Sequence, residues 1–164
     1  MKSVKVLLLL LALLVSPLAS ADAPNTVTWA TATKGGGFQL FGKNLAEVIN
    51  ATDSRIHVDA IATRGSRQNL DLLAAGEVDV GQGEGNAARI ARDGSGRPAA
   101  DLSVMSLMSP NPGMFVVRGD SAYQRIEDLK GQPIAFGTRA SGLRILANDV
   151  LDGLGLQPEK DFSQ

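Results

Sequence analysis

Three times in this chain a short apolar segment runs into a glycine-rich turn, and an amphipathic segment follows the turn. The turns are residues 34–38, 63–66 and 137–142. A helix that begins at such a turn leaves its first backbone N–H groups unpaired and carries a partial positive charge there. Because glycine adds no side-chain bulk, an anion can approach this backbone closely. The pattern predicts an α/β protein with anion-binding turns, although glycine also serves turns that bind nothing.

The periodicity of residues 26–91 predicts alternating strands and helices. Strands are expected at 26–31, 56–61 and 78–80, and a helix is expected after each of them. The order βαβαβ predicts parallel strands with right-handed crossovers. Such sheets bind ligands outside the carboxyl ends of their strands, which is where the first two glycine-rich turns fall.

The second half of the chain begins a new unit of the same kind. Apolar segments at 102–108 and 114–118 are predicted strands, and the proline-rich break between them predicts a domain crossing. A short helix near 126–129, a strand at 134–136 and a helix with apolar positions from Leu143 to Leu154 are expected next. We therefore expect a first lobe at 22–110, and the crossing with the start of a second lobe at 111–164.

The predicted second lobe is incomplete, because a parallel sheet needs several strands covered on both faces. The chain is therefore expected to be the N-terminal part of a longer protein. The alternative is a complete small domain with a frayed tail.

The first 21 residues predict a secretory signal peptide. Lys2 and Lys5 precede an apolar run at 6–15, and Ala19, Ser20 and Ala21 form a small-residue cleavage site. We place cleavage after Ala21 and expect a periplasmic protein with no stable membrane insertion afterwards. The alternative is an uncleaved N-terminal anchor.

Composition excludes several functional classes. Removal of residues 1–21 takes away two lysines and no acid, so the formal net charge changes from -1 to -3, which argues against a nucleic-acid partner. Cysteine is absent, and His57 is the only histidine. No disulfide, thiolate metal site or cysteine nucleophile is therefore available, and His57 is expected to be an outward residue of a strand. We expect no cofactor and no metal site.

The order of these segments resembles the TAXI family, the solute-binding proteins of tripartite (TRAP) transporters. The segments that carry the resemblance are residues 32–42, 44–50, 63–69, 72–79, 82–84, 114–121 and 126–142. The resemblance implies a type II periplasmic-binding-protein fold with two lobes of mainly parallel sheet, a ligand between the lobes, TRAP membrane permease subunits as partners and no catalysis. This chain departs from the family pattern at Gly37, Phe38 and Gln39, where the family often has a hydroxyl residue and paired aromatics.

Twelve residues in and after the turns are the candidate ligand contacts. They are Gly36, Gly37, Phe38, Arg64, Gly65, Ser66, Gln82, Glu84, Gly137, Thr138, Arg139 and Ser141. Arg64 and Arg139 could each bind a carboxylate with two hydrogen bonds, or could be ordinary solvated arginines. Ser66 and Ser141 could instead cap their own helices, and Glu84 could favour a helix start.

The function predicted from these features is capture of a small organic anion, such as a glutamate-like amino acid or a dicarboxylate, for delivery to a TRAP transporter. The alternatives are a ligand sensor for a membrane kinase, an ABC-type substrate-binding protein and, with less support, an exported enzyme. An enzyme would need a base and a nucleophile in hydrogen-bond reach, and the turns offer serines and arginines but no histidine.

Overall fold

A computed structural model describes residues 23–110 and 112–163. The predicted signal peptide lies outside the described residues. No helix among the described residues is long and apolar enough to cross a membrane. Residues 23–110 make up the sheet region, and residues 112–163 make up the C-terminal segment.

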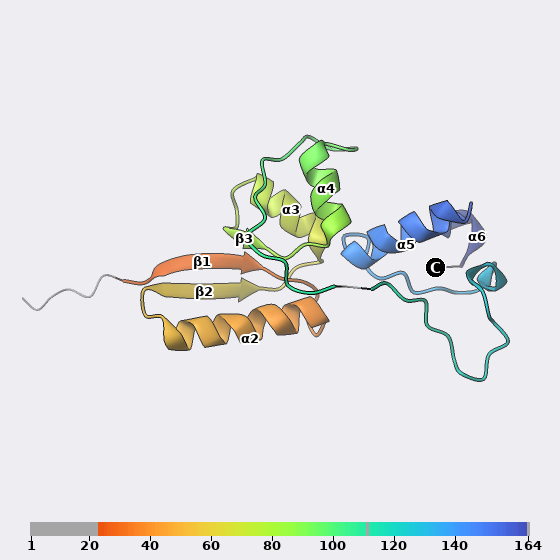
Figure 1. The fold of residues 1–164 in the computed structure, drawn as a ribbon, viewed down its shortest axis with the longest axis horizontal. Coiled ribbons are helices and arrows are strands. Elements are labelled where there is room, and N and C mark those ends of the chain that lie inside the picture. Colours follow the sequence, from red (N-terminus) through yellow and green to blue (C-terminus); the bar gives the residue numbers. More distant parts are fainter. Residues whose placement is uncertain (1–22, 111, 164) are drawn as a thin grey trace, which may run out of the picture.

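The sheet region holds three parallel strands in the order β2-β1-β3 (Figure 1). β1 (Asn25–Ala30) pairs with β2 (Ile56–Ile61) over six residues, from Asn25 opposite Ile56 to Ala30 opposite Ile61. β3 (Val80–Gly81) pairs with the end of β1, Val80 opposite Trp29. The predicted βαβαβ order and parallel sheet are confirmed, and the boundaries of β1 and β2 agree with the prediction to within one residue.

The third strand begins later than predicted. Val78 is buried but lies outside the ladder. The Thr28 N–H donates to the Asp79 carboxylate over 2.8 Å, and the Asp79 N–H donates to the Thr28 carbonyl over 3.1 Å. The side chain of Asp79 therefore takes the N–H that a ladder partner would use, and strand pairing starts at Val80, two residues after the predicted start.

Three helices cover the sheet. α2 (Gly37–Thr52) lies on one side, and α3 (Ser66–Ala74) and α4 (Gly85–Asp93) lie on the other (Figure 1). Trp29, Val58 and Ala46 form a core between the strands and α2, and Leu70, Ala87 and Ala91 form a second core between α3 and α4. The sheet face toward α2 is thus buried, whereas Thr26, His57 and Asp59 on the other face are exposed.

The C-terminal segment contains helices and extended chain. Its elements are the 3-10 helix η1 (Ile126–Leu129), α5 (Gly142–Gly153) and α6 (Pro158–Asp161). Its core gathers Leu129, Phe136, Ala147, Leu151, Leu156 and Phe162. The rings of Phe115 and Phe162 each meet the Phe136 ring edge-on, with centroids 6.5 Å and 5.7 Å away. The predicted short helix and long helix are confirmed.

The predicted strands at 102–108, 114–118 and 134–136 are wrong for the residues that the structure describes. Those residues belong to no ladder, and a single bridge pairs Pro133 with Ser163. Val104, Leu107 and Val116 are 74%, 91% and 83% exposed. These segments have the composition of strands, but a strand also needs a neighbour to accept its backbone hydrogen bonds.

Candidate functional site

The candidate site lies at the carboxyl ends of the strands, in the turns that connect β1 to α2, β2 to α3 and β3 to α4. Parallel strands end at one edge of a sheet, so these three turns share an edge. The side chain of Asn69, fully buried, holds the edge together. Its amide donates to the carbonyls of Ala30, Thr31 and Gln82, and its oxygen accepts from the Thr63 hydroxyl over 2.6 Å.

The second and third glycine-rich turns, which are 74 residues apart in the sequence, lie against each other. The Thr138 hydroxyl donates to the Arg64 carbonyl over 2.9 Å, and the Arg67 N–H donates to the Ala140 carbonyl over 3.0 Å. Gly65 has a φ of +117°, and a Cβ added there would lie 3.0 Å from the Ser141 Cα. Glycine at this position meets two requirements, a backbone conformation that other residues rarely adopt and close approach of the neighbouring turn.

The start of α4 packs into the same contact. The Glu84 N–H donates to the Ser66 hydroxyl over 3.1 Å. A Cβ added at Gly142 would lie 2.5 Å from the Glu84 Cβ and 2.7 Å from the Ser66 Oγ. The structure therefore brings together Arg64, Gly65, Ser66, Glu84, Thr138 and Ser141, all of which the sequence singled out.

Several backbone N–H groups at these helix starts already have protein acceptors. Glu84 is the N-cap of α4 and accepts from the N–H groups of Asn86 and Ala87. Ser141 is the N-cap of α5 and accepts from the Arg144 N–H over 3.1 Å. With these donors engaged, the side chains around the turns become the main candidates for binding an anion.

A cavity of about 210 Å³ lies where α3 meets the third turn, and we call it the junction cavity. Its lining residues are Arg64, Arg67, Gln68, Asp71, Thr138, Arg139 and Ala140. The arginines at 64, 67 and 139 are exposed, and none of them forms an ion pair among the described residues. Three guanidinium groups and one carboxylate give the cavity a net positive charge, and guanidinium groups suit carboxylate geometry.

Arg67 was missed by the sequence analysis. It lies in the first turn of α3, whereas Arg64 precedes the Gly65 N-cap, so no helical spacing in the sequence signals that the two side chains line one cavity. Gln68 was missed as well. Its side-chain oxygen accepts from the Arg64 backbone N–H over 2.8 Å and from the Arg64 Nε over 3.3 Å, and these bonds position Arg64.

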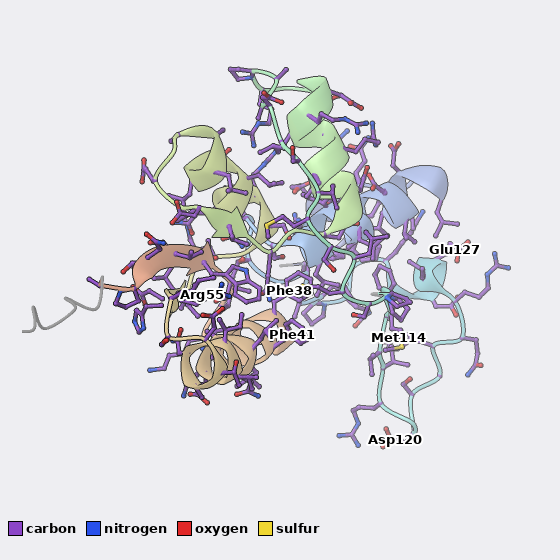
Figure 2. The ribbon with its side chains drawn as sticks, turned by 60° about the vertical axis from the view of Figure 1, so that its left-hand side comes forward. Phe38, Phe41, Arg55, Met114, Asp120 and Glu127 are labelled. Carbon is purple, nitrogen blue, oxygen red and sulfur yellow. The ribbon has the colours of Figure 1, made fainter. Side chains whose placement is uncertain are left out.

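The first turn forms a separate part of the same strand edge. α2 starts from Gly36 without a side-chain cap, and Phe38 lies half-buried near Phe41 at this end of the helix (Figure 2). Gln82 is buried, and its amide nitrogen lies 4.0 Å from the Met108 sulfur. No hydrogen bond between described residues joins Gly36, Gly37 or Phe38 to a residue that lines the junction cavity.

Gly137 lies in the third turn and His57 lies on β2, and neither lines the junction cavity. Gly137 has a φ of +81°, and a Cβ added there would lie 3.2 Å from the Ser141 Oγ. His57 is exposed on β2. Within residues 23–110 and 112–163, no group of three or more His, Cys, Asp or Glu residues could hold a metal ion.

Comparison with known protein families gives a match over most of the chain. Residues 29–164 match the model of a family described as the NMT1-like family. The matched residues run from β1 to the end of the chain and include every residue that lines the junction cavity.

Proposed function

The chain belongs to the NMT1-like family, and we propose that it is a receptor that captures a small organic anion at the junction cavity. The family is of the periplasmic solute-binding type and is generally not enzymatic. The observation that carries the proposal is the convergence of Arg64 and Arg67 from the sheet region and Arg139 from the C-terminal segment on one cavity.

The size and charge of the cavity point to the ligand class. A volume of about 210 Å³ is below the range of about 300–1,000 Å³ typical of pockets for drug-sized ligands, so a small acid fits better than a nucleotide. A carboxylate that accepts two hydrogen bonds from one guanidinium would neutralise charge that is otherwise repulsive. A glutamate-like amino acid and a dicarboxylate both meet these conditions.

The first turn is proposed as a second contact. The start of α2, with Gly36, Gly37 and Phe38, has no side-chain cap, so its backbone N–H groups could meet a second polar group of the ligand. A Cβ added at Gly37 would meet nothing within 4 Å, so Gly37→Val fits the fold and tests the turn. We expect this variant to weaken binding and to leave the thermal transition unchanged.

Calorimetry with purified protein tests the main proposal. We expect binding of succinate or L-glutamate and no binding of glucose. Arg64→Gln and Arg139→Gln should each weaken binding by about tenfold or more, because a charge-assisted hydrogen bond contributes about 1.5–3 kcal/mol. The control is Arg89→Gln on α4, an exposed arginine that lies 3.4 Å from Asp93 and does not line the cavity. A preference for neutral sugars over every acid would contradict the proposal.

Delivery to a membrane permease of the TRAP type, between two lobes that close on the ligand, belongs to the same proposal. Residues 1–21 would direct export, with cleavage after Ala21 and function in the periplasm. Mass spectrometry of the protein from a periplasmic extract should then find a chain that begins at Asp22. Permease genes beside the gene for this protein would support the transport partner, whereas a kinase gene there would favour a sensory receptor.

A further inference from the structure

One carboxylate stands among the arginines of the junction cavity. Asp71 lies on α3 four residues after Arg67, a spacing at which opposite charges on a helix commonly pair. In the structure its Oδ1 instead lies 2.6 Å from the Nη1 of Arg97. Arg97 belongs to the loop after α4 and does not line the cavity.

The loop that carries Arg97 is held firmly against α4. Gly94 ends α4 with a left-handed φ of +73°, and a Cβ added there would lie 3.1 Å from the Ala99 nitrogen. The Ser95 N–H donates to the Ile90 carbonyl, and the Ala100 N–H donates to the Ala91 carbonyl over 2.9 Å. The Arg97 side chain is only 18% exposed, so its guanidinium is positioned before any ligand arrives.

Burial of the Arg97 guanidinium costs free energy unless the ion pair with Asp71 offsets that cost. The Arg97 Nε is buried and has no hydrogen-bond partner among the described residues. A buried guanidinium needs a nearby acceptor, and Asp71 is the carboxylate that meets it. Asp71 thus forms its ion pair with Arg97 of the α4 loop rather than with Arg67.

We propose that Arg97 is a positioning residue for the junction cavity: by holding the Asp71 carboxylate, it keeps that carboxylate from pairing with Arg67 and leaves the three cavity arginines to an anionic solute. This inference rests on the proposed function of the cavity. Without Arg97, Asp71 would act as an internal competitor for the anion, because a carboxylate on the same helix is always present at a high effective concentration.

A double-mutant cycle measured by calorimetry with succinate as the probe tests this role. Arg97→Gln should weaken succinate binding by about tenfold, because the freed carboxylate then competes for Arg67. Asp71→Asn should strengthen binding by a few-fold, since it removes the one negative charge from the lining. The double variant should bind as tightly as Asp71→Asn alone, and Arg97→Lys should retain most of the affinity.

The rescue separates positioning from a merely structural role. If Arg97 only stabilised the loop, the double variant would bind as weakly as Arg97→Gln, and this result would overturn the inference. The matched control is Arg92→Gln, an exposed arginine of α4 whose Nε lies 3.4 Å from Asp93. If the wild type binds succinate and Arg97→Gln binds it equally well, the role of Arg97 is overturned and the proposed function of the cavity stands. A wild-type protein that binds no acid would overturn the proposed function and this inference together.

Discussion

The β1–β2 pair and the segments at 102–110 and 112–118 have similar apolar sequences but different structures. β1 and β2 form a six-residue ladder, and Trp29 and Val58 within it are buried. At 102–110 and 112–118, the described residues of the second region form no ladder and leave Leu107 and Val116 exposed. A segment with the composition of a strand therefore forms one only where a backbone partner and a covering helix are both in place.

The C-terminal segment nevertheless builds a core. Leu151 is fully buried, and Arg144 lies over the Phe136 ring at 4.9 Å and pairs with Glu159 at 2.7 Å. Helices satisfy their backbone hydrogen bonds internally, so α5 can pack its apolar face without a sheet. Local hydrogen bonding therefore explains why the predicted helices formed in both regions and the predicted strands in only one.

The largest expected effect follows from breaking the sheet region at Asn69. Asn69→Leu removes the amide that joins the ends of β1 and β3. The carbonyls of Thr31 and Gln82 lose this donor, while the Ala30 carbonyl keeps the Gln82 N–H. We expect the free energy of unfolding to fall by about 4 kcal/mol, because each buried polar group left unpaired costs about 1–3 kcal/mol. Urea unfolding followed by Trp29 fluorescence measures the loss.

The control for this substitution is Asn44→Leu, at an exposed position of α2, which should change the free energy of unfolding by less than about 0.5 kcal/mol. An Asn69 variant within about 1 kcal/mol of the wild type, on the scale of one hydrogen bond, would show that the strand ends do not depend on this side chain.

The next largest effect is expected from a substitution in the core of the C-terminal segment. Leu151→Ala leaves a cavity in the core of the C-terminal segment and should cost about 3 kcal/mol there. Hydrogen exchange read by mass spectrometry should show amides of α5 exchanging about 100-fold faster, with β1 and β2 unchanged. Leu154→Ala, at a residue that is 44% exposed, is the control. Equal acceleration in β1 would mean that the two regions unfold as one unit.

Much of the fold could be predicted because its signals are local. Alternation at 56–61 identified β2, and glycine turns identified the helix starts. The strands at 102–108 and 114–118 could not be judged from sequence, since pairing depends on residues far along the chain. The later start of β3 depends on a side chain, that of Asp79, which competes with the ladder.

The site was predictable in part for the same reason. Arg64, Thr138 and Arg139 were selected from their turns, and the structure places all three around one cavity. Sequence left open whether Glu84 and Ser141 cap helices, and the structure shows that both do. The position of Arg67 in the cavity lining and the pairing of Arg97 with Asp71 were not foreseen, because each depends on which elements meet in the folded chain.

A smaller effect is expected where the second region is already exposed. Leu107→Ser should change the free energy of unfolding by less than about 0.5 kcal/mol, since Leu107 is 91% exposed. It should, however, reduce self-association measured by sedimentation velocity, because exposed apolar chain without strand partners promotes association. Leu102→Ser is the matched contrast. Leu102 packs against the core of α3 and α4, so this variant should be destabilised. If the wild type and Leu107→Ser associate equally, the contact between copies of the protein lies on another surface.

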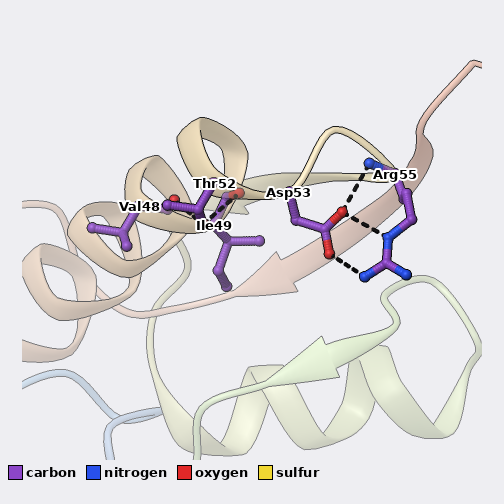
Figure 3. A network of polar contacts seen from close by, with 5 residues as sticks. All are labelled: Val48, Ile49, Thr52, Asp53 and Arg55. Atoms are coloured by element: carbon purple, nitrogen blue, oxygen red, sulfur yellow. Dashed lines mark hydrogen bonds and ion pairs between the residues drawn. The ribbon is translucent and has the colours of Figure 1, made fainter.

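The smallest effect concerns a local ion pair that both regions possess. Between α2 and β2, the Asp53 carboxylate accepts from the Arg55 Nε, Nη2 and backbone N–H over 2.7–3.0 Å (Figure 3). The side-chain hydrogen bonds of Arg55, followed by its backbone N–H, lower the pKa of Asp53 from 3.8 to about 2. On the loop of the C-terminal segment (Figure 2), the side-chain hydrogen bonds of Arg118 lower the pKa of Asp120.

Because the folded-state pKa of Asp53 is depressed, its stabilising contribution is present above pH 3.8 and is lost as the pH falls toward 2. A carboxyl titration by NMR should find the low pKa, and Arg55→Gln should raise it only part of the way to 3.8, since the backbone N–H of residue 55 remains. The thermal transition at neutral pH should hardly change, because exposed ion pairs contribute little. If Asp120 titrates at its ordinary value while Asp53 does not, an ion pair between residues two apart in the sequence needs a neighbouring ladder, such as that of β1 and β2, to hold it in place. If both are lowered, the difference between the two regions lies entirely in their long-range contacts.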